Sequence, residues 1–314
     1  MKIQHEINPI TNPYLSCTQI TFATYALNNN RHYEMVLSET WGFDYRDNEN
    51  VFGESLHPGY QGRRRELLEK YHGIRVTDLP YESKMDLCSK IYSYINKFGP
   101  MLLMCDIYNC SWNMAYRHDH VNHFIIIIGA NDQNSTVTIL DPFTSEDKHE
   151  VDLNDVANEN GTLCYFEIVD HESILDIDIK NELNHTLEHI RSIDMFNKME
   201  LFSKSIPEMF EFGDVTIKNV YAVPLVFNLY RIMNQRYCFS IFLEYACNYR
   251  NIEERFVSEM KALAEKYKLL RFLVVKTILQ GKSTEMVVDI VNDIISKERN
   301  LYAELVNSLK NEEK

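Results

Sequence analysis

The sequence predicts an α+β fold, with helices and antiparallel strands in its first part and an α-helical region after it. Two observations predict this. Apolar, β-branched runs between residues 100 and 169 are separated by turn residues, as in strands. Four later stretches repeat apolar residues at helical spacing instead. We therefore expect a first domain at residues 1–172 and an α-helical domain at residues 173–314.

The composition is that of a globular protein, with 45% hydrophobic and 25% charged residues. No run approaches the ~18 apolar residues that span a bilayer, and the first residues lack the apolar core of a secretory signal, so we expect a cytoplasmic protein without a membrane segment. Its seven cysteines are scattered and form no Cys-x-x-Cys pair, which excludes an obvious disulfide framework or zinc ribbon. The net charge of −14 argues against a nucleic-acid partner.

The first informative stretch is residues 12–28, where Ser16 and Gln19 have the spacing of a capping box. Apolar residues at helical spacing follow, so a helix should begin at Ser16 with Cys17 in its first turn. Free backbone N–H groups and the helix dipole favour an anion at that position, which lowers the pKa of a thiol and can hold an oxyanion. Cys17 is thus a candidate nucleophile; the alternative is one more buried cysteine.

Residues 39–45 and 53–62 combine aromatic residues with glycine, which is typical of a substrate cleft or of a long loop packed on the core. Helices are expected at residues 66–71 and 81–97, and a buried strand at residues 100–106. The following loop, residues 107–122, carries Trp112, Tyr116, His118 and His120. Its histidines suggest either a metal site or, without a well-spaced third ligand, a loop beside His123.

Residues 123–141 have the pattern of a β-hairpin, with apolar strands at 124–128 and 137–140 around a polar turn. If the turn is centred on Asp132, His123 faces Asp141 directly, with Cβ atoms roughly 5 Å apart. A turn centred one residue away makes the contact diagonal. In the direct pairing an imidazole meets a carboxylate that can orient it, although a His and an Asp at strand ends are also common polar rim residues. A cysteine with a distant His and Asp is the thiol-nucleophile arrangement.

Six short motifs together resemble the butirosin biosynthesis protein H family. They are Ser16-Cys17 opening a helix, Trp-Gly-Phe-Asp-Tyr at 41–45, Gly-Pro at 99–100, Cys-Asp-Ile-Tyr at 105–108, Asn-His-Phe-Ile at 122–125 and Leu-Asp-Pro-Phe at 140–143. The resemblance implies a papain-like cysteine peptidase fold for the first domain and a helical C-terminal region. It makes Cys17 the nucleophile, His123 the base and Asp141 the orienting residue. The upstream Gln of the peptidases has no clear match, and Asn12 is the candidate in its place.

The same resemblance implies acyl transfer from a thioester on an acyl carrier protein to the amine of a small molecule in antibiotic biosynthesis, without a cofactor or metal. Alternatives are a papain-like peptidase, amidase or thioesterase, and an inactive binding or scaffold module. Acyl carrier proteins are usually acidic, so this acidic chain needs a local basic patch to receive one. Arg63, Arg64 and Arg65, or Arg117, are candidates for that patch.

The helical region is expected at 183–209, 220–250, 252–279 and 283–309, with a turn around Gly281. His185, Glu188 and His189 match the H-x-x-E-H zinc pattern, but an exposed helix face is the simpler interpretation. Charges of alternating sign, Arg236 among them, are expected on solvated faces.

Overall fold

The computed structural model describes residues 2–46, 53–59, 62–131, 133–158, 161–169, 177–210, 220–249, 252–281 and 283–311. The chain divides into two compact units, which we call unit 1 (residues 1–36 and 64–174) and unit 2 (residues 37–63 and 175–314). The sequence suggests a single division between residues 172 and 173, whereas these units also group residues 37–63 with the helical part of the chain. Residues 172 and 173 themselves lie outside the described part of the chain.

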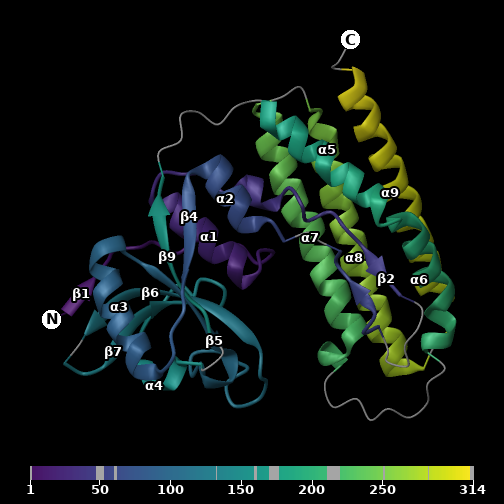
Figure 1. The fold of residues 1–314 in the computed structure, drawn as a ribbon. Helices are drawn as coiled ribbons and strands as arrows, with labels where there is room; N and C mark the ends of the chain where they lie inside the picture. Colours follow the sequence, from purple (N-terminus) through teal and green to yellow (C-terminus); the bar gives the residue numbers. More distant parts are fainter. Residues whose placement is uncertain are drawn as a thin grey trace. The chain divides into compact units, whose positions relative to one another are not determined.

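Unit 1 is built on a 7-stranded antiparallel sheet (Figure 1). Its strands are, in spatial order, β4 (Ile74–Leu79), β9 (Leu163–Ile168), β5 (Met101–Asp106), β6 (Asn122–Asn131), β7 (Thr136–Leu140) and β8 (Lys148–Asp152). A short β1 (Lys2–Gln4) pairs with the end of β6, beyond the residues that pair with β5. Strand β6 is therefore central, and His123 lies near its first residue.

Helices cover both faces of this sheet. The helices in the described part of unit 1 are α1 (Cys17–Asn28), α2 (Arg64–His72), α3 (Lys84–Phe98) and the one-turn α4 (Leu153–Val156), with the 3-10 turn η2 (Ile107–Asn109). A second 3-10 turn, η1 (Glu34–Leu37), ends at the first residue of unit 2. Helix α3 buries Leu87, Ile91 and Ile95 against one face. On the other face, side chains of α1 and α2 pack together with Leu102 and Phe166 of the sheet.

The predicted strands at 100–106 and in the hairpin correspond to β5, β6 and β7, and the predicted helices to α1, α2 and α3. Strands β4 and β8 were not predicted. Strand β8 alternates between exposed and half-buried residues and carries Lys148, Glu150 and Asp152, so it has almost no apolar signal. It forms because its backbone pairs with the whole of β7, which a single-sequence pattern does not reveal.

The strands of the hairpin pair in a different register from the first expectation, which centred the turn on Asp132. Ile126 pairs with Leu140 and Ile127 with Ile139, and the register shifts again before Gly129. The expected turn centre, Asp132, lies outside the described residues, and Ser135, three residues later, has a left-handed backbone (φ 54°). Asp141 is consequently diagonal to His123 rather than directly opposite, which is the alternative that a shifted turn predicts.

Unit 2 contains the helical region that the sequence predicts. Its helices are α5 (Ile177–Ser192), α6 (Met195–Met209), α7 (Pro224–Cys247), α8 (Glu254–Gln280) and α9 (Glu285–Asn311), with the 3-10 turn η3 (Val220–Ala222) before α7 and a two-stranded sheet of β2 (Asp44–Tyr45) and β3 (Leu56–His57). The stretch 183–209 is not one helix, because Asp194 has a left-handed backbone (φ 55°) between α5 and α6. Gly281 ends α8 in the left-handed conformation (φ 60°), as its turn position predicts.

Residues 37–63 supply part of the core of unit 2. Trp41 and Phe43 are fully buried, so these aromatic residues pack in the core instead of lining a cleft. Arg236 is also fully buried and forms a two-pronged ion pair with Glu298, at 2.9 Å and 3.1 Å. The prediction that Arg236 lies on a solvated face is therefore wrong. Its guanidinium also donates to the carbonyl of Gly42 at 2.8 Å.

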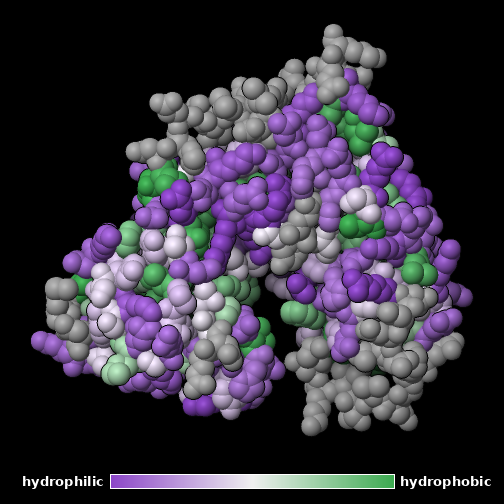
Figure 2. Space-filling view, in the orientation of Figure 1, coloured by the Kyte–Doolittle hydropathy of each residue, from purple (hydrophilic) through white to green (hydrophobic). Residues whose placement is uncertain are grey.

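In the view of Figure 2 the surface is largely hydrophilic, with small, scattered hydrophobic patches. Within the described residues, none of the helices combines the length and apolar character needed to cross a membrane.

Candidate active site

Cys17 is the first residue of α1, where the predicted capping box forms. The Ser16 hydroxyl accepts a hydrogen bond from the N–H of Gln19 at 3.4 Å, and the Gln19 side chain accepts from the N–H of Ser16 at 2.9 Å. These two bonds fix the first turn of the helix. Because α1 packs against β6, this turn lies beside the start of the central strand. Cys17 itself is half-buried.

His123 and Asp141 meet at one end of the sheet. His123 is the second residue of β6, and Asp141 directly follows β7. Nε2 of His123 lies 2.9 Å from Oδ2 of Asp141, and the two residues are 3% and 0% exposed. A buried pair of this kind holds the ring in a single orientation. It also leaves Nδ1 of His123 as the nitrogen available to another group.

That other group is Cys17, because the side chains of Cys17 and His123 shift each other's pKa. Burial alone raises the pKa of Cys17, but the bond to His123, its positive charge and bonds from the Phe124 backbone and Thr18 lower it below its usual value. Burial likewise lowers the pKa of His123, but its bonds to Asp141 and Cys17 and their negative charges raise it to about 10. Opposite shifts in two bonded groups favour a thiolate beside an imidazolium.

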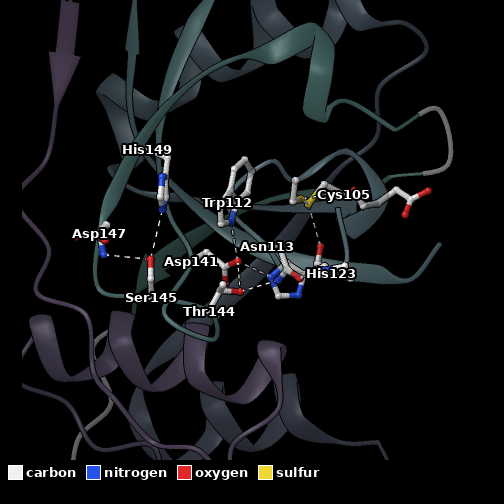
Figure 3. A network of polar contacts seen from close by, with 12 residues as sticks. Cys105, Trp112, Asn113, His123, Asp141, Thr144, Ser145, Asp147 and His149 are labelled. Atoms are coloured by element: carbon white, nitrogen blue, oxygen red, sulfur yellow. Dashed lines mark hydrogen bonds and ion pairs between the residues drawn. The ribbon is translucent and has the colours of Figure 1, made fainter. Parts of the chain in front are cut away.

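Asp141 is held by more than His123, as Figure 3 shows. The indole N–H of Trp112 donates to Oδ2 of Asp141 at 2.9 Å, and the Thr144 hydroxyl donates to the same oxygen at 2.8 Å. Asn113 in turn donates to the Thr144 hydroxyl at 2.8 Å. Burial raises the pKa of Asp141, but His123, Trp112 and Thr144 together lower it below its usual value, so the residue is a carboxylate.

An aromatic ring covers one side of the imidazole. The ring of Phe143 lies 5.7 Å from that of His123, with a tilt of 59°. Phe143 is nevertheless 45% exposed, so an apolar surface borders the buried base. On the neighbouring strand, Cys105 pairs with His123 in the β5–β6 register, and its thiol lies 3.6 Å from that of Cys110. The neighbouring Cys110 and burial raise the pKa of Cys105, which keeps that thiol protonated.

The other sequence candidates make hydrogen bonds or ring contacts of their own, or are exposed. Nδ1 of His120 bonds to Asp106 at 2.6 Å and its ring stacks on Tyr108, while His118 is exposed. Asn12 accepts a hydrogen bond from the N–H of Tyr14 at 3.0 Å through its side-chain oxygen.

The H-x-x-E-H pattern lies on α5 of unit 2. Nδ1 of His185 lies 3.2 Å from the Arg63 guanidinium, and Nε2 of His189 lies 3.0 Å from the carbonyl of Gly59. Glu188 is exposed. Across the described ranges, no group of three or more His, Cys, Asp and Glu residues is arranged to hold a metal ion.

Sequence reasoning brought together Cys17, His123 and Asp141 but assigned no role to Trp112, Thr144 or Asn113. Trp112 stood out only as an aromatic residue in the loop before His123. Thr144 follows the Asp-Pro-Phe motif, and a turn in which its N–H donates to the Asp141 carbonyl at 3.0 Å brings its hydroxyl back to the carboxylate. No spacing rule predicts that two residues 29 positions apart, Trp112 and Asp141, share a hydrogen bond.

Comparison of the chain with protein-family models and with curated proteins finds no match.

Proposed function

We propose that this protein is a cysteine-dependent acyltransferase that moves an acyl group from a thioester to an amine, with a papain-like arrangement of Cys17, His123 and Asp141. One observation carries the proposal: His123 lowers the pKa of a cysteine at a helix start, and a buried carboxylate 2.9 Å away orients that imidazole. These three groups are the nucleophile, base and orienting residue that we propose for covalent catalysis.

In the first half-reaction, the Cys17 thiolate attacks the thioester carbonyl. The N–H groups of Gln19 and Ile20 already donate to Ser16, whereas those of Cys17 and Thr18 precede them and have no acceptor within the helix. These two N–H groups are our candidates for holding the oxyanion, with Asn12 as a possible side-chain donor. Collapse of the intermediate breaks the bond to the donor sulfur. The departing thiolate takes the proton of the His123 imidazolium, and an acyl-Cys17 enzyme remains.

In the second half-reaction, an amine attacks the acyl-Cys17 carbonyl. Neutral His123 accepts the amine proton, the carbon–sulfur bond breaks, and an amide leaves while the thiolate–imidazolium pair is restored. Asp141 stabilises the imidazolium in both steps. Amide formation from a thioester is downhill, which favours transfer over the reverse reaction.

The resemblance to the butirosin biosynthesis protein H family suggests an acyl carrier protein as donor and a small-molecule amine as acceptor. Of the basic candidates, Arg63 pairs with Glu39 and Glu182, and Arg65 pairs with Asp78 at 2.7 Å. Arg117 contacts the rings of Tyr108 and Tyr116 instead. It lies in the loop that leads to His123, so it is our preferred contact for an acidic carrier.

Two rivals use the same site differently. If water reaches the acyl-enzyme, the protein is a thioesterase, amidase or peptidase. If Cys17 does not acylate, the first domain is a binding or scaffold module. The exposed ring of Phe143 beside His123 favours an apolar group near the base.

The deciding experiment is intact-protein mass spectrometry after mixing the full chain with short acyl thioesters. We expect one acyl group on the wild type and none on Cys17→Ala, with discharge by added amines faster than by water. A matched control is Cys88→Ala, because burial raises the pKa of the half-buried Cys88 and this variant should still acylate. Discharge by water alone would establish the hydrolase, and no adduct with any thioester would favour the binding module.

A further inference from the structure

We propose that Trp112 and Thr144 are positioning residues that lock the rotation of the Asp141 carboxylate and thereby keep Cys17 and His123 in their charged forms. The proposal rests on the Cys17–His123 pair used in the proposed function, but it does not depend on which acyl donor or acceptor the protein uses.

The two donors approach the carboxylate from different parts of the chain. Trp112 comes from the loop after η2, and Thr144 from the turn after β7 (Figure 3). Both donate to Oδ2 of Asp141, the same oxygen that faces His123. Three donors on one oxygen leave the other, Oδ1, buried and without a hydrogen-bond partner among the described residues.

This asymmetry is the reason to assign a positioning role. A buried carboxylate gains most when its bonds are spread over both oxygens, so an orphaned Oδ1 is costly. Here two neutral donors hold Oδ2 in place against rotation about the Cβ–Cγ bond. Without them, either oxygen or neither can face Nε2 of His123. If Trp112 and Thr144 only stabilised the negative charge of Asp141, a bond to Oδ1 would serve as well as a bond to Oδ2.

Neighbouring side chains restrain both Trp112 and Thr144. Asn113 donates to the Thr144 hydroxyl at 2.8 Å, which sets the direction of the hydroxyl proton toward Asp141. The Trp112 ring stacks on His149 of β8, with ring centres 5.4 Å apart. The indole N–H therefore has little freedom to turn away from the carboxylate.

Other titratable groups face this network from the neighbouring elements. Cys105 on β5 donates to the His123 carbonyl and lies near Cys110, and its pKa is raised by that pairing and by burial. Asp106 at the end of β5 is paired with His120. His149 lies against Trp112 on the side of β8. Of these, His149 needs a control, because it contacts one of the two proposed residues directly.

The direction in which the pKa of Cys17 should change follows from the His123–Asp141 ion pair. If the carboxylate rotates away, His123 loses the bond and charge that raise its pKa, while burial continues to lower it. A neutral imidazole then no longer lowers the pKa of Cys17. The thiolate should appear at higher pH. If Trp112 and Thr144 only stabilised the negative charge of Asp141, their removal would make Oδ2 a stronger hydrogen-bond acceptor for the His123 imidazolium. The Cys17 thiolate would then appear at lower pH.

The experiment measures the pH dependence of Cys17 alkylation by iodoacetamide in the full chain, by peptide mapping. The variants are Trp112→Phe, Thr144→Val and the double variant. Each single variant retains one of the two donors to Asp141, so we expect the midpoint pH of Cys17 alkylation to rise only slightly. The double variant should shift by on the order of one pH unit, more than the sum of the two, because it removes both restraints on one bond.

Two controls test specificity. Trp41→Phe removes the other tryptophan of the chain, whose indole N–H donates to Glu298 of unit 2 at 2.8 Å, and should leave the midpoint unchanged. His149→Gln removes the ring on which Trp112 stacks but neither donor to Asp141, so it should raise the midpoint by no more than Trp112→Phe does. Circular dichroism establishes that each variant is folded, and Thr144→Val, a nearly isosteric change, tests the proposal if Trp112→Phe does not fold.

An unchanged midpoint in folded Thr144→Val and double variants, or a shift to lower pH, would overturn the proposal. The outcome is independent of acyl transfer. A protein that shows the shift but never acylates disproves the proposed function alone, whereas one that acylates without the shift disproves the positioning role alone.

Discussion

Nε2 of His123 lies 2.9 Å from Oδ2 of Asp141, in a place where neither side chain is open to solvent. The two residues reach each other diagonally across a hairpin whose register is shifted near Gly129. This contact holds the imidazole that lowers the pKa of Cys17, so the chemistry of the thiol depends on the geometry of the hairpin. Four predictions test that dependence and the fold that supports it.

Cys17 should react with iodoacetamide at lower pH than any other half-buried cysteine. Its pKa is lowered by His123, whereas burial raises the pKa values of Cys88 and Cys247. At pH 6 to 7 we therefore expect alkylation at Cys17 to be at least about tenfold faster than at Cys88. Peptide mapping after brief treatment gives the rates, and equal rates would argue that Cys17 is an ordinary buried thiol.

Asp141→Asn should destabilise unit 1 in a pH-dependent way. The pKa of His123 is raised from 6.5 to about 10, so its contribution is complete below pH 6.5 and disappears as pH rises through 10. The pKa of Asp141 is lowered from 3.8, so its contribution is complete above that pH and disappears as pH falls through the lowered value. The loss should therefore be largest between pH 3.8 and 6.5, roughly 1.5–3 kcal/mol for a bond to a charged group.

The measurement is denaturant unfolding of Asp141→Asn and its parent in a Trp41→Phe background, where Trp112 of unit 1 is the remaining tryptophan. A difference that stays constant from pH 4 to pH 10 would mean that the two groups are not an ion pair.

Ser16→Ala should affect both stability and the thiol. The variant loses the bond from the Ser16 hydroxyl to the N–H of Gln19, which costs about 1 kcal/mol. It should also raise the pH at which Cys17 alkylates, because the first turn of α1 loosens around the sulfur. The matched control is Ser83→Ala, since Ser83 caps α3 by accepting from the N–H of Asp86 at 3.1 Å. That variant should cost similar stability and leave the alkylation of Cys17 unchanged.

Glu298→Ala should be strongly destabilising for unit 2. It leaves the fully buried Arg236 without its carboxylate and removes the acceptor of the Trp41 indole, an effect we expect to cost about 3–5 kcal/mol. The exposed pair of Arg299 and Glu200 provides the comparison, because Glu200→Ala should cost less than about 1 kcal/mol. Denaturation followed by circular dichroism at 222 nm measures both. Similar losses would mean that burial of the Arg236–Glu298 pair has little energetic consequence.

Local chemistry was enough to predict several parts of this molecule. Ser16 and Gln19 determined where α1 begins, because a capping box satisfies the free N–H groups of a helix start through residues only three apart. The apolar runs around residues 124–128 and 137–140 determined the hairpin, and helical spacing determined most of unit 2. The meeting of His123 with Asp141 followed from the hairpin, since residues close in a hairpin are also close in space.

Tertiary structure decided what depends on residues far apart in the chain. The polar, partly exposed strand β8 forms because its backbone pairs with every residue of β7. Residues 37–63 join the helical unit because Trp41 and Gly42 meet the Arg236–Glu298 pair across some 200 residues, which no periodicity encodes. Trp112 and Thr144 meet at Asp141 for the same reason. A sequence pattern specifies which face of an element is buried, but only packing of the whole unit decides which side chains share a hydrogen bond there.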